Sequence, residues 1–322
     1  MSNVYTSTDS GSLGTSLLQT ALDKHVNYLL RAQPMFRQLA DKRPVDQSFP
    51  GTSVVFQFWN EIPDVTAELS ETVDPDSVGV PSTTSVTVTL KEYGATILAT
   101  RKLQLMAITD VDTGIADLLA WHMRDQIDKL VEPILRAGTH VIRRNNAVLK
   151  SDMLATGAGT TGAVKSTDIL TSSVGRLAVA KFRGNKVVPR QGELYAAFVH
   201  PDCAHDLKAE TGDGSWRVPH EFSGSESIWN SNVGVYEGAY YIESPRIYNT
   251  TDGDTSARVY RNYFLGKEAL AEAIGEEVSI KQGPITDKLG RFTPWGWYGL
   301  LGWSLFRQDS LIRAEVSSSI AA

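Results

Sequence analysis

The sequence predicts an α+β protein in which one long helix accompanies several β-strands. Residues 112–141 carry apolar side chains at helical spacing. Residues 51–59 and 85–90 are rich in β-branched and aromatic side chains, which is typical of strands. A further strand is predicted at 193–199, in the second half of the chain. We therefore expect the sheets to come from both halves of the chain and the long helix to lie between them in sequence.

The long helix has one apolar and one charged face. The apolar stripe consists of Ile115, Leu119, Met123, Ile127, Val131 and Ile134. Asp112 or Thr113 can cap its start, Gly138 can end it, and Pro133 predicts a bend. About 28 residues at roughly 1.5 Å each give a rod of roughly 40 Å. A central helix of an enzyme domain remains the alternative interpretation of this segment.

Composition limits the classes of function. Hydrophobic residues are 42% and charged residues 21% of the 322 residues, as in folded globular proteins. Cys203 is the single cysteine, which excludes an intrachain disulfide and a zinc site built from several thiolates. The net charge of −6 disfavours a dedicated DNA-binding protein. We find no apolar run that predicts a membrane span or a signal peptide, so we expect assembly in a cytoplasm and no membrane partner.

The first 100 residues contain an arm and a hairpin. Residues 1–14 are small and polar, and a helix interrupted at Pro34 is predicted for 15–40. The runs 51–59 and 85–90 are predicted partner strands, and a third strand covers 93–100. The segment between the partner strands contains no Lys or Arg, and its acidic residues are Glu61, Asp64, Glu68, Glu71, Asp74 and Asp76. At more than about 20 residues it is long for a simple turn. It is either functional or a solvated acidic loop.

The middle of the chain contains two candidate chemical motifs. Gly157, Gly159 and Gly162 match the glycine spacing of a dinucleotide-binding loop, but no apolar strand precedes them, so we interpret them as a linker. The segment HPDCAHD at 200–206 has metal-binding residue types. A predicted strand at 193–199 runs into Pro201, which is typical of an ordinary helix start. A metal-dependent enzyme that uses this segment is retained as an alternative.

Several short motifs, in order, resemble the major capsid protein of tailed bacteriophages. They are His200, Pro201, Asp206 and Leu207; then Gly234, Glu237 and Gly238; then Glu243, Ser244 and Arg246; together with Leu69, Ser70 and Glu71, the KEYGA run from Lys91 to Ala95, and Gly266 with Ala269. The resemblance runs from about residue 15 to the C-terminal strands. Each motif is short, and their order and spacing carry the likeness.

The resemblance implies a tailed-phage major capsid fold with five parts. These are an N-terminal arm at 1–49, an extended β-hairpin loop at 50–104, a peripheral domain at 105–165 with its spine helix at 112–141, an axial domain at 166–275, and a return to the peripheral domain at 276–322. The resemblance places the return strands at 277–282 and 295–316. It implies a structural protein, not an enzyme, without metal or cofactor. Copies of the chain would form hexamers and pentamers of an icosahedral shell that encloses double-stranded DNA without sequence-specific binding.

The resemblance also implies possible portal, scaffold or decoration proteins as further partners. A cellular nanocompartment shell of the same fold is the main alternative. We expect intersubunit contacts at Glu61, Glu68, Glu71, Asp74, Arg136, Arg143, Arg144, Trp295 and Trp297. Simple solvation is the alternative for the charged residues, and burial in a core strand or a sugar-binding platform is the alternative for the tryptophans.

Overall fold

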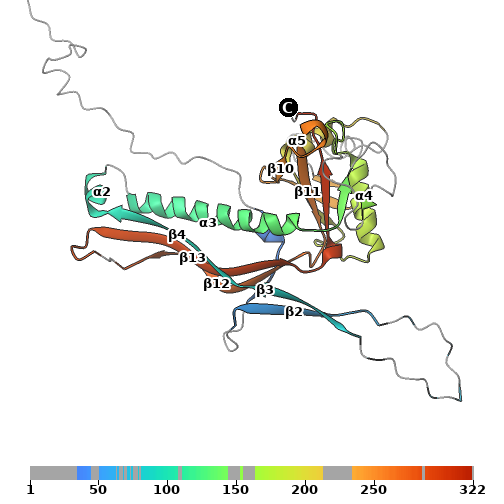
Figure 1. Cartoon of the computed structure of the whole chain (residues 1–322), viewed down its shortest axis with the longest axis horizontal. Helices are drawn as coiled ribbons and strands as arrows, with labels where there is room; N and C mark the ends of the chain where they lie inside the picture. Colours follow the sequence, from blue (N-terminus) through green and yellow to red (C-terminus); the bar gives the residue numbers. More distant parts are fainter. Residues whose placement is uncertain are drawn as a thin grey trace, which may run out of the picture.

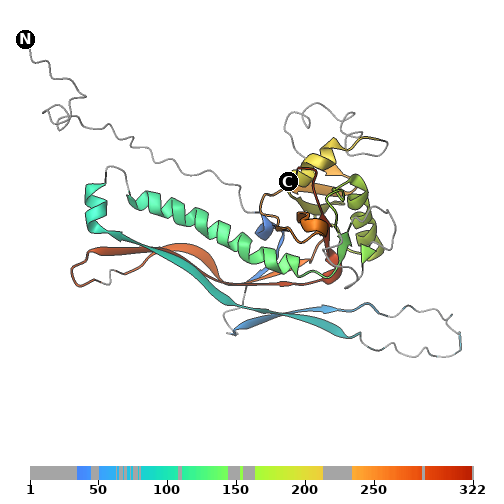
Figure 2. The same ribbon diagram turned by 45° about the horizontal axis from the view of Figure 1, so that its top comes forward.

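The computed structural model describes residues 35–44, 51–62, 64, 68, 71, 72, 74, 79, 81–107, 111–143, 153–154, 164–212, 234–284 and 287–320. In this part of the chain the strands form three sheets, of four, eight and two strands. Figures 1 and 2 show an elongated molecule. The eight-stranded sheet and two helices lie at one end, and the long helix and four-stranded sheet extend away from them.

The four-stranded sheet has the order β1-β12-β13-β4. The strands are β1 (Asp41–Pro44), β4 (Lys91–Thr100), β12 (Leu270–Gln282) and β13 (Phe292–Leu305). β1 runs parallel to β12, and the other neighbours are antiparallel. The strand predicted at 277–282 is confirmed, but the observed strand begins earlier, at Leu270. Residues 270–273 have a helix-favouring composition, and their pairing with β13 overrides it.

Helix α3 (Val111–Arg136) lies along this sheet, after the short α2 (Arg101–Met106). Its buried apolar residues Leu119, Ile127, Val131 and Leu135 confirm one apolar face. The helix ends five residues before the predicted limit of 141. A Cβ at Gly138 would lie 2.7 Å from Leu311, and the chain turns there into β5 (Val141–Arg143).

The eight-stranded sheet has the order β6-β5-β14-β11-β7-β9-β8, with β10 paired to β11. Its other strands are β6 (Met153–Leu154), β7 (Tyr195–Val199), β8 (Gly234–Tyr236), β9 (Ala239–Glu243), β10 (Asn249–Thr250), β11 (Val259–Leu265) and β14 (Leu311–Val316). Helices α4 (Ser172–Gly184) and α5 (Pro201–Ala209) contribute to a shared core with Phe182, Tyr195 and Phe264. Glu237 and Gly238 form the β8–β9 turn with φ angles of 50° and 84°.

The last strand differs from the sequence-based division of the chain. β14 pairs with β11 and β5 in the eight-stranded sheet, whereas the predicted return strand 295–316 assigned it to the peripheral domain. The reason is the break after β13, where the 3-10 helix η5 (Gln308–Ser310) redirects the backbone. A similar short 3-10 helix, η4 (Asp254–Ser256), precedes β11.

The third sheet is the hairpin of β2 (Ser53–Trp59) and β3 (Thr83–Thr89), which confirms the predicted strand pair. Phe56 and Val88 on one face are buried, and both belong to a core cluster that includes Phe306. In Figures 1 and 2 the hairpin extends away from α2, and the ends of its strands that lead into the acidic loop are farthest from that helix.

Candidate interaction surfaces

The 3-10 helix η1 (Phe36–Leu39) is fixed to α3 by one carboxylate. The oxygens of Asp128 accept the backbone N–H groups of Met35 at 2.8 Å and Phe36 at 3.0 Å. Burial raises the pKa of the Asp128 carboxyl, and the backbone donors oppose that shift. The Phe36 ring packs edge-on against Phe198, with centroids 4.9 Å apart. This segment therefore joins α3 to the eight-stranded sheet.

Arg37 joins the same segment to β12. Its Nε lies 2.6 Å from Oε1 of Glu272 and its Nη2 lies 2.7 Å from Oε1 of Glu277. Burial alone would lower the pKa of the Arg37 guanidinium, but the two carboxylates raise it. Burial raises the pKa of Glu272, against the opposing effect of Arg37. No local pattern in the sequence marks this pair, because the two residues are 235 positions apart.

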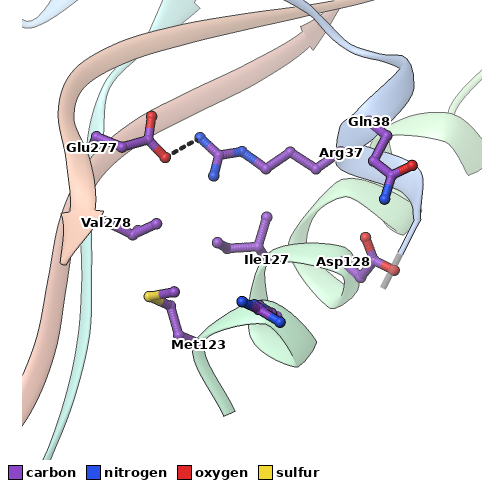
Figure 3. Close-up of a pocket in the computed structure, with 8 residues that line it drawn as sticks. Arg37, Gln38, Met123, Ile127, Asp128, Glu277 and Val278 are labelled. Carbon is purple, nitrogen blue, oxygen red and sulfur yellow. Dashed lines mark ion pairs between the residues drawn. The ribbon is translucent and has the colours of Figure 1, made fainter. Parts of the chain in front are cut away.

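A cleft of about 370 Å³ lies between η1, α3 and β12 (Figure 3). Met123, Ile127 and Val278 form its apolar part, and the Arg37 side chain extends across it toward Glu277. Among the residues that the structure describes, no serine, cysteine or lysine lines the cleft. In the described part of the chain, no group of three or more His, Cys, Asp or Glu side chains is arranged to hold a metal ion.

The HPDCAHD segment forms the start of α5. Pro201 is at its first position, and Nδ1 of the preceding His200 accepts the N–H of Asp202 at 3.2 Å, which confirms the predicted helix start. Burial raises the pKa of the Cys203 thiol to about 12, so this thiol is unreactive near neutral pH. Asp206 accepts the backbone N–H of Ser319 at 2.9 Å. The segment therefore anchors the end of the chain.

The motif residue Arg246 fixes the loop after β9 to α3. Its Nη1 forms a buried ion pair with Asp125, which also binds Lys129 at 2.7 Å. Burial would raise the pKa of Asp125, but Lys129 and Arg246 together lower it. Glu243 of the same motif lies 2.8 Å from Lys208 on α5. Arg246 thus joins the loop after β9 to α3, and Glu243 joins β9 to α5.

The arginines that the sequence suggested for subunit contacts have partners in their own chain. Nε of Arg143 lies 2.6 Å from the buried Glu315, which also binds Arg313 at 2.9 Å. The guanidinium of Arg136 lies 4.0 Å from the ring centroid of Tyr248. Both side chains thus stabilise the junction of α3, β5 and β14. Arg144 lies outside the described residues.

The four acidic candidates are exposed. Oε2 of Glu61 lies 3.2 Å from Nζ of Lys186, but both side chains are more than three-quarters exposed, so this pair contributes little stability. Glu68, Glu71 and Asp74 have no ion pair with any described residue. Glu68, Glu71 and Asp74 are therefore open to solvent in a single chain.

The two tryptophan candidates have different environments. Trp297 is 3% exposed, and its Nε1 donates to Nδ1 of His122 at 3.0 Å. His122 on α3 therefore contacts the four-stranded sheet. Trp295 is partly buried, and its Nε1 meets no acceptor among the described residues.

Taken together, the geometry defines a structural subunit. One long helix lies along the four-stranded sheet, and a projecting hairpin carries exposed apolar side chains at Val55 and Trp59. None of the described helices is long and apolar enough to cross a membrane. This arrangement serves contacts between macromolecules.

Comparison with known proteins agrees with this class. The sequence matches the phage capsid protein family over residues 12–297, and the chain belongs to that family. The capsid of Ralstonia phage GP4 has a similar fold, with a TM-score of 0.74 and 13% identity, over 98% of this chain and 99% of that chain. The capsid of cyanophage Pam1 is similar with a TM-score of 0.73 and 13% identity, over 97% of this chain and 99% of that chain.

The head structure of Helicobacter pylori bacteriophage KHP40 gives a TM-score of 0.74 and 12% identity, over 98% of this chain and 99% of that chain. No curated protein matches the sequence. The tailed-phage capsid fold implied by the resemblance is confirmed. The chain is a shell-forming major capsid protein and therefore a component of the virion.

Proposed function

We propose that copies of this chain assemble into hexamers and pentamers that tile an icosahedral shell around double-stranded DNA. The hairpin of β2 and β3 carries this proposal. Its exposed apolar side chains Val55, Trp59 and the adjoining Ile62 are 50%, 67% and 61% exposed. Fully burying one large apolar side chain stabilises a contact by about 1.5–3 kcal/mol. A projecting element with such side chains is suited to lie on a neighbouring copy.

The proposed division of labour follows the sequence-based boundaries. Residues 1–49 form the arm, 50–104 the extended hairpin, 105–165 the peripheral domain with its spine helix, 166–275 the axial domain and 276–322 the return segment. We assign the end of this last part, β14, to the axial domain, because it pairs with β11 and β5.

Among the candidate contact residues, we propose Glu61, Glu68, Glu71, Asp74 and Trp295 as subunit contacts. Their exposure or their unpaired polar atoms support this choice. We assign Arg136, Arg143 and Trp297 to the internal structure of the subunit, because each has a partner within the chain.

We further propose that the chain catalyses no reaction and encloses DNA without reading its sequence. The net charge of −6 supports a wall with weak affinity for phosphates. Portal, scaffold and decoration proteins are proposed additional partners. Family membership favours a viral shell over a cellular nanocompartment on the same fold.

Deleting residues 62–82 and joining Glu61 to Thr83 with a short Gly-Ser linker tests the proposal. The expected result is a folded, soluble subunit that forms no closed shells by negative-stain electron microscopy. Circular dichroism, compared with the full-length chain, controls for folding. Closed shells of normal size from the deletion variant would contradict the role proposed for the hairpin.

A further inference from the structure

We propose that the free edge of β4 pairs with β4 of a second copy across a two-fold axis, so that two four-stranded sheets join into one. The inference deepens the proposed function and rests on it, because it names a contact that connects copies within the shell. The partner to which it commits is another copy of this chain. The contact involves neither the β2–β3 hairpin nor the loop between those strands.

β4 is the last strand of its sheet and has hydrogen-bond partners on one side only. All ten residues of Lys91–Thr100 pair with β13, and no bulge interrupts the register. In the described part of the chain, no backbone hydrogen bond reaches the opposite edge of β4. Ten residues at roughly 3.3 Å each leave an edge of roughly 33 Å, whose N–H and C=O groups are open to a further strand.

This edge lacks the features that normally keep edge strands apart. At the other edge of the same sheet, β1 is only four residues long and ends at Pro44, which cannot donate to a further strand. β4 contains no proline, and its charged residues are Lys91 and Glu92 at its start. A long, regular edge without charges along most of its length is a template for strand addition by another chain.

The outer face of β4 carries an apolar projection beside an apolar hollow. Tyr93 packs against the core cluster that includes residues of α3. Because side chains alternate along a strand, Gly94, Thr96 and Leu98 lie on the face away from that helix. Leu98 is 62% exposed. A mainly apolar hollow of about 330 Å³ lies on the same part of the sheet, and its lining includes Gly94, Thr96, Lys281, Pro294, Gly296 and Tyr298.

Self-pairing places Leu98 at this hollow in both directions at once. In the antiparallel register that sets Thr96 opposite Thr96 of the second copy, Leu98 of each copy lies opposite Gly94 of the other. Residues 92–100 of the two strands are then paired along their whole length. Because glycine has no side chain, Leu98 can lie over Gly94 and reach the hollow toward Tyr298. The same contact is made twice, as in an isologous interface.

The symmetry of this pairing also suits a shell. Opposed residues of antiparallel strands point to the same side of a sheet, so the two-fold axis runs perpendicular to the joined sheet. α3 of both copies therefore lies on the same side. Copies in a wall one subunit thick all present the same face to the interior, and this pairing preserves that arrangement. A two-fold contact also closes on itself, so it can join two neighbouring rings of subunits.

A cysteine on the symmetry axis tests the pairing. Thr96→Cys should form a disulfide between two copies in oxidised shells, because opposed residues have Cα atoms about 4.5–5.5 Å apart. Non-reducing gel electrophoresis should then show most of the chain as a dimer. Lys281→Cys is the matched control, since it lies on the same face but two strands from the edge, and it should remain monomeric. The natural Cys203 is buried and does not interfere.

Substitution of Leu98 tests the apolar contact. In Leu98→Lys the yield of closed shells, measured by sedimentation, should fall by about tenfold or more, because a charge on an edge strand opposes pairing. Leu98→Met keeps an apolar side chain of similar volume and should leave the yield normal. Since Leu98 is mostly exposed in a single chain, circular dichroism and urea unfolding should show that the lysine variant folds normally.

Closed shells in which oxidised Thr96→Cys stays monomeric would overturn the pairing, and the proposed function would stand. Normal shells from Leu98→Lys would do the same. A disulfide between Thr96→Cys and a different protein would assign the edge to that partner and overturn self-pairing. An unaltered chain that never associates would overturn the proposed function and this pairing with it.

Discussion

Nε of Arg37 lies 2.6 Å from Oε1 of Glu272, a carboxylate with no exposed surface on β12. Through this pair the 3-10 helix η1, which lies within the N-terminal arm, is bound to the sheet that supports α3. The subunit is therefore held together by ionic contacts between distant segments as well as by its core. Substitutions at Arg37 and Glu272 therefore test whether this contact holds the subunit together.

Arg37→Met should destabilise the subunit by about 3–5 kcal/mol, because it leaves the Glu272 carboxylate buried without a partner. Urea unfolding of the dissociated subunit measures this change. The double variant Arg37→Met with Glu272→Met should lose less stability than either single variant, since no buried charge remains. Additive losses in the double variant would contradict this reasoning.

Asp128→Ala should cost about 1–3 kcal/mol, because the buried N–H groups of Met35 and Phe36 lose their acceptor. Hydrogen exchange should also become faster at residues 35–40. Asp128→Asn keeps one acceptor oxygen and should show a smaller effect. Unchanged exchange at residues 35–40 in Asp128→Ala would show that this carboxylate does not hold the segment.

Trp297→Phe should cost more stability than Trp295→Phe. Both changes remove an indole, but only the Trp297 indole donates a hydrogen bond, to His122. That bond contributes about 0.5–1.5 kcal/mol. Thermal unfolding of the two variants gives the comparison. Equal or greater loss in Trp295→Phe would contradict the assigned roles.

The stability of the subunit should decrease as the pH falls below about 6.5, the ordinary pKa of histidine. Burial lowers the pKa of His200, and the nearby Arg258 lowers it further, whereas Asp202 raises it. Because the net pKa is lowered, the folded protein holds this residue neutral. Its surroundings also include the Tyr260 ring, 4.6 Å away, and Asn262, which accepts its backbone N–H. Below that pH, residue 200 binds a proton in the unfolded state while it stays neutral in the folded state. The unfolded state is therefore favoured, and the protein loses stability as the pH falls.

Comparing variants isolates this effect. His200→Asn retains a helix-capping side chain. Between pH 7 and pH 5 this variant should lose less folding stability than the unaltered chain. His205→Asn, at an exposed position five residues away, should behave like the unaltered chain. If His200→Asn and the unaltered chain lose stability in parallel over this range, His200 is not the group responsible.

Individual helices and strands were predictable because the sequence patterns that mark them lie within a few consecutive residues. The alternation of Val86 and Val88 with threonines predicts β3, the helical spacing from Ile115 to Val131 predicts α3, and Pro201 marks the start of α5. The strand boundaries agreed within a few residues for the hairpin.

The long-range contacts were not predictable from one sequence. The pairing of Arg37 with Glu272 and of Arg143 with Glu315 joins residues 235 and 172 positions apart, and no local pattern marks them. For the same reason Arg143 was assigned to a subunit contact instead of an internal ion pair.

A cryo-electron microscopy reconstruction of particles assembled from the unaltered chain tests the central claim most directly. The account predicts closed shells in which β2 and β3 of each copy lie on a neighbouring copy. A chain that remains a compact monomer, with residues 50–104 folded onto its own body, would contradict it.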